Sequence, residues 1–169
     1  QIKSAGSQNT SSPYVFGEQA IGGAWRSGSA KTTLAVANPY DGKVLVNIKD
    51  ANVDDVDEAF SAAEQAQVGW AALLPVQRAD VMRRAATIME GRREEIVQWL
   101  IRESGSTRIK AEMEWGTVRS IVLESSTLPS RLTGRILGGD FPGKENRIYR
   151  TPVGVVAVIS PWNWPAHLS

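Results

Sequence analysis

The chain has 169 residues, of which 19 are Lys or Arg and 18 are Asp or Glu, so its formal net charge is +1 at pH 7. Its 42% hydrophobic and 22% charged residues are typical of a soluble globular protein and exclude extensive disorder. The near-neutral charge excludes nucleic-acid binding and attraction to an anionic membrane as the main function, and no apolar run is long enough for a transmembrane helix. Because the sequence has no Cys, disulfides, Cys-based zinc sites and a cysteine nucleophile are excluded within these residues.

The opening of the chain is polar, and its first secondary structure is expected to be β. Residues 1–16 lack the basic and apolar regions of a signal peptide, so we expect a flexible tail and a cytoplasmic protein. Gly22-Gly23 lies between apolar residues and predicts a tight hairpin, because both glycines can adopt a positive φ. A second hairpin is expected from residues 32–37 and 43–48, which flank the turn sequence NPYDG at 38–42.

The middle of the chain is predicted to be helical. Asn52 is expected to cap the first helix, with Asp54 and Asp55 favourably placed near its positive N-terminus. Apolar residues recur at helical spacing along one face of this helix: Val53, Val56, Phe60 and Ala63. Gly69 and Trp70 are expected to lie beyond its end.

Proline and glycine mark the boundaries of the next helices. A second helix is predicted to begin at Pro75, to be interrupted at Gly91 and to close at Gly105. A third is predicted to begin at residue 106 or 107, to run to about residue 126 and to be ended by Pro129.

Strand patterns return in the last quarter of the chain. Residues 131–137 and 146–150 alternate and predict a long antiparallel ribbon, which needs a partner surface to be stable. Between them, residues 138–144 match G-x-x-x-x-G-K, but Glu145 stands where a phosphate-binding loop has Ser or Thr, so a turn is expected. Residues 153–159, VGVVAVI, are apolar throughout, which is typical of a strand buried on both faces of a parallel sheet.

The loop after this strand carries the most informative residue, Asn163. Ligands of α/β proteins bind at the carboxyl ends of the strands, which is where Asn163 is expected. Its side-chain amide can donate a hydrogen bond to a developing oxyanion without titrating, and the flanking prolines would keep the loop rigid. An Asn that caps a following helix is the alternative interpretation.

The segment TPVGVVAVISPWNWPAHLS, residues 151–169, resembles the aldehyde dehydrogenase superfamily, whose members carry P-W-N-[FW]-P after a strand. The similarity extends upstream through NPYDGKVLVNI, the helical region and GDFPGKENRIYRTPVGV, and it covers residues 17–169. The segments IRESGSTRIKAEMEWG and FPGKENRIYR are similar to those of the aromatic-aldehyde branch, the benzaldehyde and vanillin dehydrogenases.

The resemblance implies an α/β fold of which this chain forms the N-terminal part, with helices, an antiparallel oligomerisation ribbon and the first strand of a Rossmann-like parallel sheet. Residues 17–130 would belong to the cofactor-binding domain, residues 131–150 to the ribbon, and residues 151–169 to the first Rossmann strand and its loop. The implied activity is NAD- or NADP-dependent oxidation of an aldehyde, by a homodimer or homotetramer.

The resemblance also assigns site residues. Asn163 would be the oxyanion-hole side chain, and His167, the single histidine, would be structural rather than an acid or base. The residues implied to contact NAD(P) are Ile159, Ser160, Pro161 and Trp162. Those implied to line the aldehyde tunnel are Trp164, Leu168, Met113 and Thr117. No metal ligand is implied.

The reaction of the family also needs a Cys nucleophile and a Glu base, both of which lie downstream of the Asn163 motif. We therefore expect the 169-residue chain to be the N-terminal segment of a complete enzyme and to be inactive by itself. A naturally short, non-catalytic binding or oligomerisation module is a second hypothesis. An unrelated small mixed α/β binding protein is a third.

Overall fold

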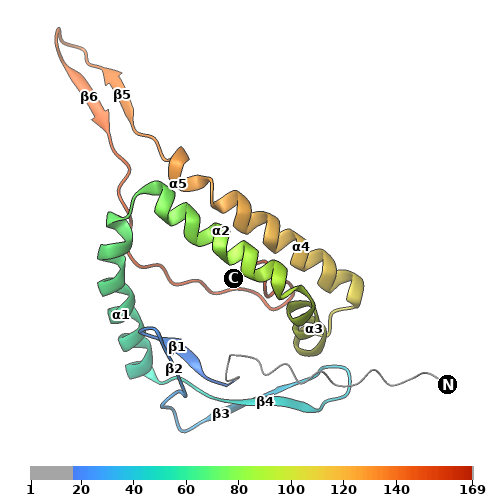
Figure 1. Cartoon of the computed structure of the whole chain (residues 1–169). Coiled ribbons are helices and arrows are strands. Elements are labelled where there is room, and N and C mark those ends of the chain that lie inside the picture. The colour runs from blue at the N-terminus through green and yellow to red at the C-terminus, as the bar shows by residue number, and fades with distance from the viewer. Residues whose placement is uncertain (1–16, 169) are drawn as a thin grey trace.

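The computed structural model describes residues 17–168, and the expected tail at residues 1–16 lies outside them. Helices form the body of the chain, and antiparallel strand pairs lie around it (Figure 1). The helices are α1 (Val53–Ala72), α2 (Pro75–Gly91), α3 (Arg93–Ser104), α4 (Arg108–Ser125) and α5 (Leu128–Arg131). The strands are β1 (Gln19–Ile21), β2 (Ala24–Arg26), β3 (Thr33–Ala37), β4 (Val44–Lys49), β5 (Arg135–Gly138) and β6 (Glu145–Ile148).

The two predicted N-terminal hairpins are confirmed. Strands β1 and β2 pair around Gly22 and Gly23, whose φ angles are 60° and 82°, in the region that disfavours residues with a Cβ. Strands β3 and β4 pair across the predicted turn, in which the Gly42 N–H donates to the Asn38 carbonyl at 2.8 Å. The first hairpin packs on α1.

The predicted start of α1 is confirmed, but its predicted end is wrong. Asn52 caps the helix and exchanges hydrogen bonds with Asp55 in a capping box. The helix continues through Gly69 and Trp70, because one exposed glycine costs a helix only about 1 kcal/mol. The apolar residues predicted at helical spacing lie in α1, and Val53, Val56 and Phe60 are exposed, since little of the described chain covers this face.

The other helix boundaries follow the predicted residues with one exception. Pro75 opens α2, α2 ends at Gly91, and Gly105 closes α3 in the left-handed conformation, with φ of 66°. The exception is Pro129, which was expected to end the third helix. Helix α4 already ends at Ser125, and Pro129 lies in the first turn of α5, where a missing N–H costs no intrahelical hydrogen bond.

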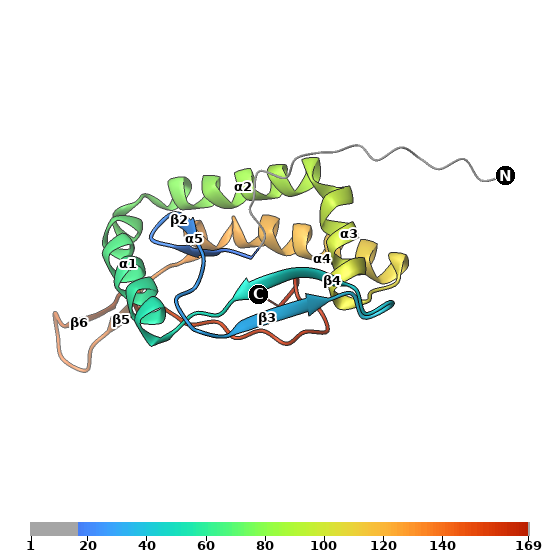
Figure 2. The ribbon, with the colours of Figure 1, turned by 90° about the horizontal axis from the view of Figure 1, so that it is seen from below.

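The core is small and lies where the helices meet. Helices α2 and α4 run side by side, and α3 packs across their end (Figures 1 and 2). Val97, Leu100 and Ala111 are buried at the centre of this packing, with Trp115 and Ala166 against them. Ala166 belongs to the C-terminal loop, so the core of the helices also holds that loop.

The predicted antiparallel ribbon is confirmed, with Arg135 opposite Ile148, but its predicted start at residue 131 is wrong, because Arg131 lies in α5 and the first strand begins at Arg135. It projects away from the helices (Figure 1). The residues of both of its strands are exposed. The buried strand expected at 153–159 is not formed. This segment has no strand pairing within the described chain, and Val153 and Ile159 are 91% and 97% exposed. A strand of a parallel sheet needs neighbouring strands, and the described residues supply none beside it.

Candidate active-site loop

Residues 160–168 form a compact loop, here called the Asn163 loop. The Ser160 hydroxyl donates to the Leu168 carbonyl and closes the loop at its two ends. Within it, the Trp164 carbonyl accepts the N–H groups of His167 and Leu168, each at 3.1 Å, which forms a helical turn. The local fold therefore follows from the chain itself, with Pro161 and Pro165 restricting φ on either side of Asn163.

Helix α4 holds this loop. Oε1 of Glu114 accepts the Ala166 N–H at 2.8 Å, and the second carboxylate oxygen forms an ion pair with Lys110. The Lys110 ammonium also lies 5.1 Å from the centre of the Trp164 ring, within the range of a cation–π interaction. The His167 ring meets the Trp164 ring edge to face, with centroids 5.5 Å apart.

The predicted site residues fall into an exposed group and a half-buried group. Asn163, Pro161, Leu168 and Met113 are exposed, and Trp162 and Ile159 are 87% and 97% exposed. Ser160, Trp164 and Thr117 are half-buried, and the Thr117 hydroxyl donates to the Met113 carbonyl at 2.9 Å.

The loop and α4 share one side of the molecule. Met113 and Thr117 follow Lys110 at spacings of three and seven residues, so both lie on the helix face that carries Lys110 and Glu114. The structure thus brings Trp164 against α4 through Lys110 and leaves the Asn163 side chain free of hydrogen bonds to residues 17–168.

Sequence reasoning missed Glu114 and Lys110. The buried residues of α4 are Ala111, Glu114 and Val118, which recur at spacings of three and four. A carboxylate at an inward position of a helix stripe is a signal for a specific partner, because an unpaired buried charge is very costly. The burial of Glu114 is known only from the structure, and so is its partner, a backbone N–H that is 52 residues away.

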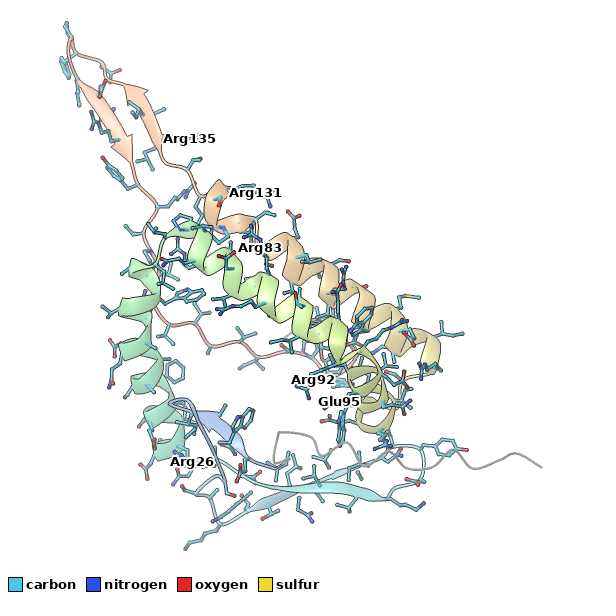
Figure 3. All side chains as sticks on the ribbon, viewed as in Figure 1. Arg26, Arg83, Arg92, Glu95, Arg131 and Arg135 are labelled. Carbon is cyan, nitrogen blue, oxygen red and sulfur yellow. The ribbon has the colours of Figure 1, made fainter. Side chains whose placement is uncertain are left out.

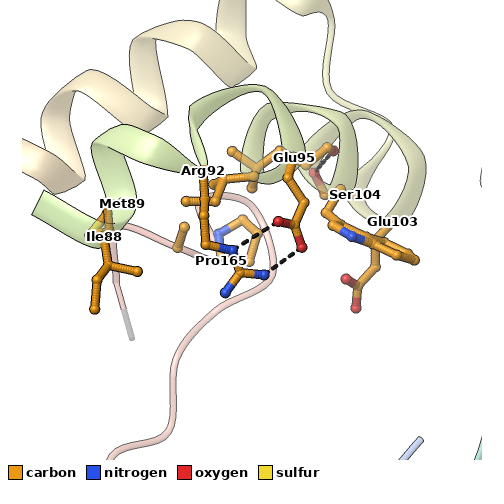
Figure 4. Close-up of a pocket in the computed structure, with 11 residues that line it drawn as sticks. Ile88, Met89, Arg92, Glu95, Glu103, Ser104 and Pro165 are labelled. Carbon is orange, nitrogen blue, oxygen red and sulfur yellow. Dashed lines mark hydrogen bonds and ion pairs between the residues drawn. The ribbon is translucent and has the colours of Figure 1, made fainter. Parts of the chain in front are cut away.

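A mostly apolar cavity of about 390 Å³ lies between the α2–α3 corner and Pro165 (Figure 4). Nε of Arg92 donates to Oε2 of Glu95 at 2.8 Å at this cavity, and the hydrogen bonds from Arg92 lower the pKa of Glu95 (Figures 3 and 4). A second cavity, of about 500 Å³, lies between α1 and residues 153–155. Asn163 lines neither of these cavities.

Within residues 17–168, no group of three or more His, Cys, Asp or Glu side chains is placed to hold a metal ion. None of the helices in that range is long and apolar enough to cross a membrane.

Comparison with known proteins identifies the family. Vanillin dehydrogenase of Corynebacterium glutamicum is 49% identical over 149 residues, which are 88% of this chain and 31% of that protein. Benzaldehyde dehydrogenase YfmT of Bacillus subtilis is 43% identical over 152 residues, which are 90% of this chain and 31% of that protein. A solved structure of an NAD-dependent benzaldehyde dehydrogenase from Corynebacterium glutamicum is 48% identical with a TM-score of 0.87, and the match covers 90% of this chain and 33% of that one.

The chain thus spans about a third of the length of the relatives it matches. Residues 25–169 match the model of the aldehyde dehydrogenase family, and this chain belongs to that family.

Proposed function

We propose that this chain is the N-terminal part of an NAD(P)-dependent aldehyde dehydrogenase that oxidises an aromatic aldehyde to the carboxylic acid. The observation that carries the proposal is the exposed Asn163 amide, which is held in a loop that is closed at Ser160–Leu168 and anchored to α4 at Ala166–Glu114. The names of the similar vanillin and benzaldehyde dehydrogenases support the substrate class.

Asn163 would stabilise the transition state. When a nucleophile adds to an aldehyde carbonyl, negative charge develops on the oxygen, and a fixed amide donor is complementary to that charge. Asn has no proton to lose at physiological pH, so the donor persists through both the oxidation and the hydrolysis of the acyl intermediate. The nucleophile and the base would come from the part of the enzyme outside residues 1–169, since this chain contains no Cys.

Residues 159–162 fit the proposed contact with NAD(P). Ile159, Pro161 and Trp162 present exposed apolar surface directly before Asn163, which is suitable for packing against a planar ring. Ser160 lies among them with its hydroxyl already bound to the Leu168 carbonyl, so its role would be to fix the backbone. When bound, NAD(P) supplies the hydride acceptor for the oxidation.

The aldehyde would bind between the Asn163 loop and α4. Trp164 and Leu168 would line the binding site from the loop, and Met113 and Thr117 from the helix. Apart from Thr117 these side chains are apolar, and an indole ring that is fixed beside Lys110 offers a flat wall for an aromatic substrate.

The extended segment 151–159 supports a longer functional protein. Its backbone would pair with further strands of a parallel sheet, and its exposed valines and isoleucine would be covered by the helices that flank such a sheet, because an isolated apolar segment is poorly stable in water. A short, non-catalytic module remains the competing proposal, and it predicts that the 169-residue chain is a stable, folded product with a binding partner.

Steady-state assays on the full-length protein test the proposal. We expect NAD(P)H formation from benzaldehyde and vanillin, with kcat/KM at least about tenfold higher than for a short aliphatic aldehyde. We expect no NAD(P)H formation from residues 1–169 alone. Absence of activity with every aldehyde would refute the enzymatic proposal, and intact mass measured on the protein from its source would then test the short module.

A further inference from the structure

Glu114 is buried completely, with 0% of its surface exposed, although it carries a charge. A carboxylate in such a position requires hydrogen bonds and a counter-ion. Both are present: Lys110, one helical turn earlier, supplies the ammonium, and the Ala166 N–H donates to Oε1 at 2.8 Å. The first partner is local to α4, whereas the second belongs to the loop that contains Asn163.

The bond to Ala166 supplies a cap that the loop itself cannot make. The turn that begins at Trp164 leaves its first N–H groups without partners in the turn, as at every helix start. A Ser, Thr, Asp or Asn at the first position would accept one of them, but an indole has no acceptor. Pro165 has no N–H, so the first N–H of this turn that a cap can accept belongs to Ala166, and Glu114 accepts it from helix α4.

We propose that Glu114 is a positioning residue that fixes the Asn163 loop from α4 and so sets the direction of the Asn163 amide. This inference rests on the proposed role of Asn163. Ala166 lies three residues after Asn163, with Pro165 between them, so a fixed Ala166 N–H restricts the backbone on one side of Asn163. The Ser160–Leu168 hydrogen bond restricts the loop at its ends.

The function of Glu114 in this role is to accept one hydrogen bond at one position. A charge is not required for that, because a glutamine amide oxygen at the same place also accepts an N–H. An aspartate at position 114 keeps the charge, but its side chain is one methylene shorter, so its oxygen would lie farther from the Ala166 N–H. If Glu114 served only the ion pair with Lys110, Asp would be the better substitute for Glu, since Lys110 needs a negative partner.

Two variants of the full-length enzyme separate these roles. We expect Glu114→Gln to keep kcat within about threefold of the wild type and Glu114→Asp to lower it about tenfold or more, with KM for NAD(P) unchanged in both. Glu124→Gln is the matched control, because Glu124 lies on the same helix with a side chain that is 66% exposed. Thermal unfolding of each variant checks that it is folded.

A double-mutant cycle with Asn163→Ala provides a readout that a merely structural role would not move. If Glu114 acts through Asn163, Glu114→Asp should lower kcat by less than about threefold in the Asn163→Ala protein. Two results would overturn this inference without contradicting the proposed role of Asn163. One is that Glu114→Asp lowers kcat by the same factor in the wild-type and the Asn163→Ala proteins. The other is that a folded Glu114→Gln variant has an about tenfold lower kcat while Glu114→Asp remains active. If Glu114→Asp does not fold, the kcat of the folded Glu114→Gln variant still tests the inference, because a loss of about tenfold in that variant would overturn it. An unchanged kcat for Asn163→Ala would instead contradict the proposed function, and with it the inference.

Discussion

Nη1 of Arg26, a side chain that is labelled in Figure 3, lies 2.7 Å from Oδ1 of Asp55, and this ion pair connects the hairpin β1–β2 to the first turn of α1. The Asp55 side chain is 3% exposed. The same carboxylate accepts the N–H of Ser29 at 2.7 Å and the N–H of Asn52 at 3.0 Å. One side chain thus caps a helix and holds the hairpin and the following loop against it.

Replacing this carboxylate should weaken the N-terminal half of the chain. The N–H groups of Asn52 and Ser29, followed by the Arg26 guanidinium, hold the pKa of Asp55 well below its ordinary value of 3.8. We expect Asp55→Asn to lower the midpoint of thermal unfolding by about 2–4 °C at pH 7, because an amide cannot accept all of these hydrogen bonds. Asp57→Asn, at an exposed position of the same helix, should leave the midpoint unchanged. Equal midpoints for wild type and Asp55→Asn would contradict the role of Asp55.

Low pH should weaken the ion pair between Glu94 of α3 and Arg108 of α4. Hydrogen bonds from Arg108 and then Gln98 lower the pKa of Glu94 from 4.5 to about 2. A lowered carboxyl pKa stabilises the fold fully above pH 4.5, and that contribution is lost as the pH falls toward 2. As the pH falls from 4.5 toward 2, we expect the midpoint of thermal unfolding to decrease less for Glu94→Gln than for the wild type, as measured by circular dichroism.

Salt provides the second test of this pair. The side chains of Glu94 and Arg108 are 63% and 50% exposed, so the interaction is partly screened by solvent. The difference between wild type and Glu94→Gln should shrink when ionic strength rises from about 0.1 M to about 1 M. Glu103→Gln, on the exposed surface of the same helix, should change neither the pH dependence nor the salt dependence. A difference that persists in high salt would contradict the electrostatic cause.

Two glycines should respond to alanine in opposite directions. Gly105 closes α3 with φ of 66°, and a Cβ there would lie 2.8 Å from Cγ of Pro39. We expect Gly105→Ala to lower the free energy of unfolding by about 1–2 kcal/mol, the cost of the left-handed conformation. Gly69 lies inside α1, and a Cβ added there would meet nothing within 4 Å, so Gly69→Ala should raise that free energy by about 0.5–1 kcal/mol. Urea unfolding measures both changes, and a destabilised Gly69→Ala variant would contradict the open, helical environment of Gly69.

The ribbon should control assembly. Ile136, Phe141 and Tyr149 are exposed on or beside β5 and β6, and an isolated two-stranded ribbon is marginal in water. We propose that it pairs with another subunit and expect Ile136→Asp to reduce the mass of the full-length protein measured by light scattering. Tyr40→Asp, at the exposed turn between β3 and β4, should leave the mass unchanged. A wild-type protein that is already monomeric would contradict the proposal.

The sequence predicted best those elements whose boundaries depend on local chemistry. Asn52, Pro75 and Gly105 each mark a helix end through a hydrogen bond or a φ angle of their own, and the structure has helix boundaries at all of them. Gly22-Gly23 marks the first hairpin in the same way. These features need no knowledge of the rest of the fold.

The errors arose where the structure depends on distant partners. Periodicity placed Val56 and Phe60 in a helix, but it cannot say which surface covers them, and the described chain leaves both exposed. The apolar run 153–159 lacks strand neighbours for the same reason. In the candidate site, the motif predicted Asn163. The hydrogen bond from the Ala166 N–H to Glu114 could not be predicted, because it depends on how α4 packs against the loop.

The kcat of the Asn163→Ala variant of the full-length enzyme, measured with benzaldehyde at saturating NAD(P), tests the proposed function most directly. Loss of one oxyanion donor costs about 10²-fold or more in turnover, and we expect a decrease of that size with an unchanged unfolding midpoint. The exposed position of Asn163 makes an effect on folding small, so activity and stability should separate. A kcat within about twofold of the wild type would show that Asn163 does not stabilise the transition state.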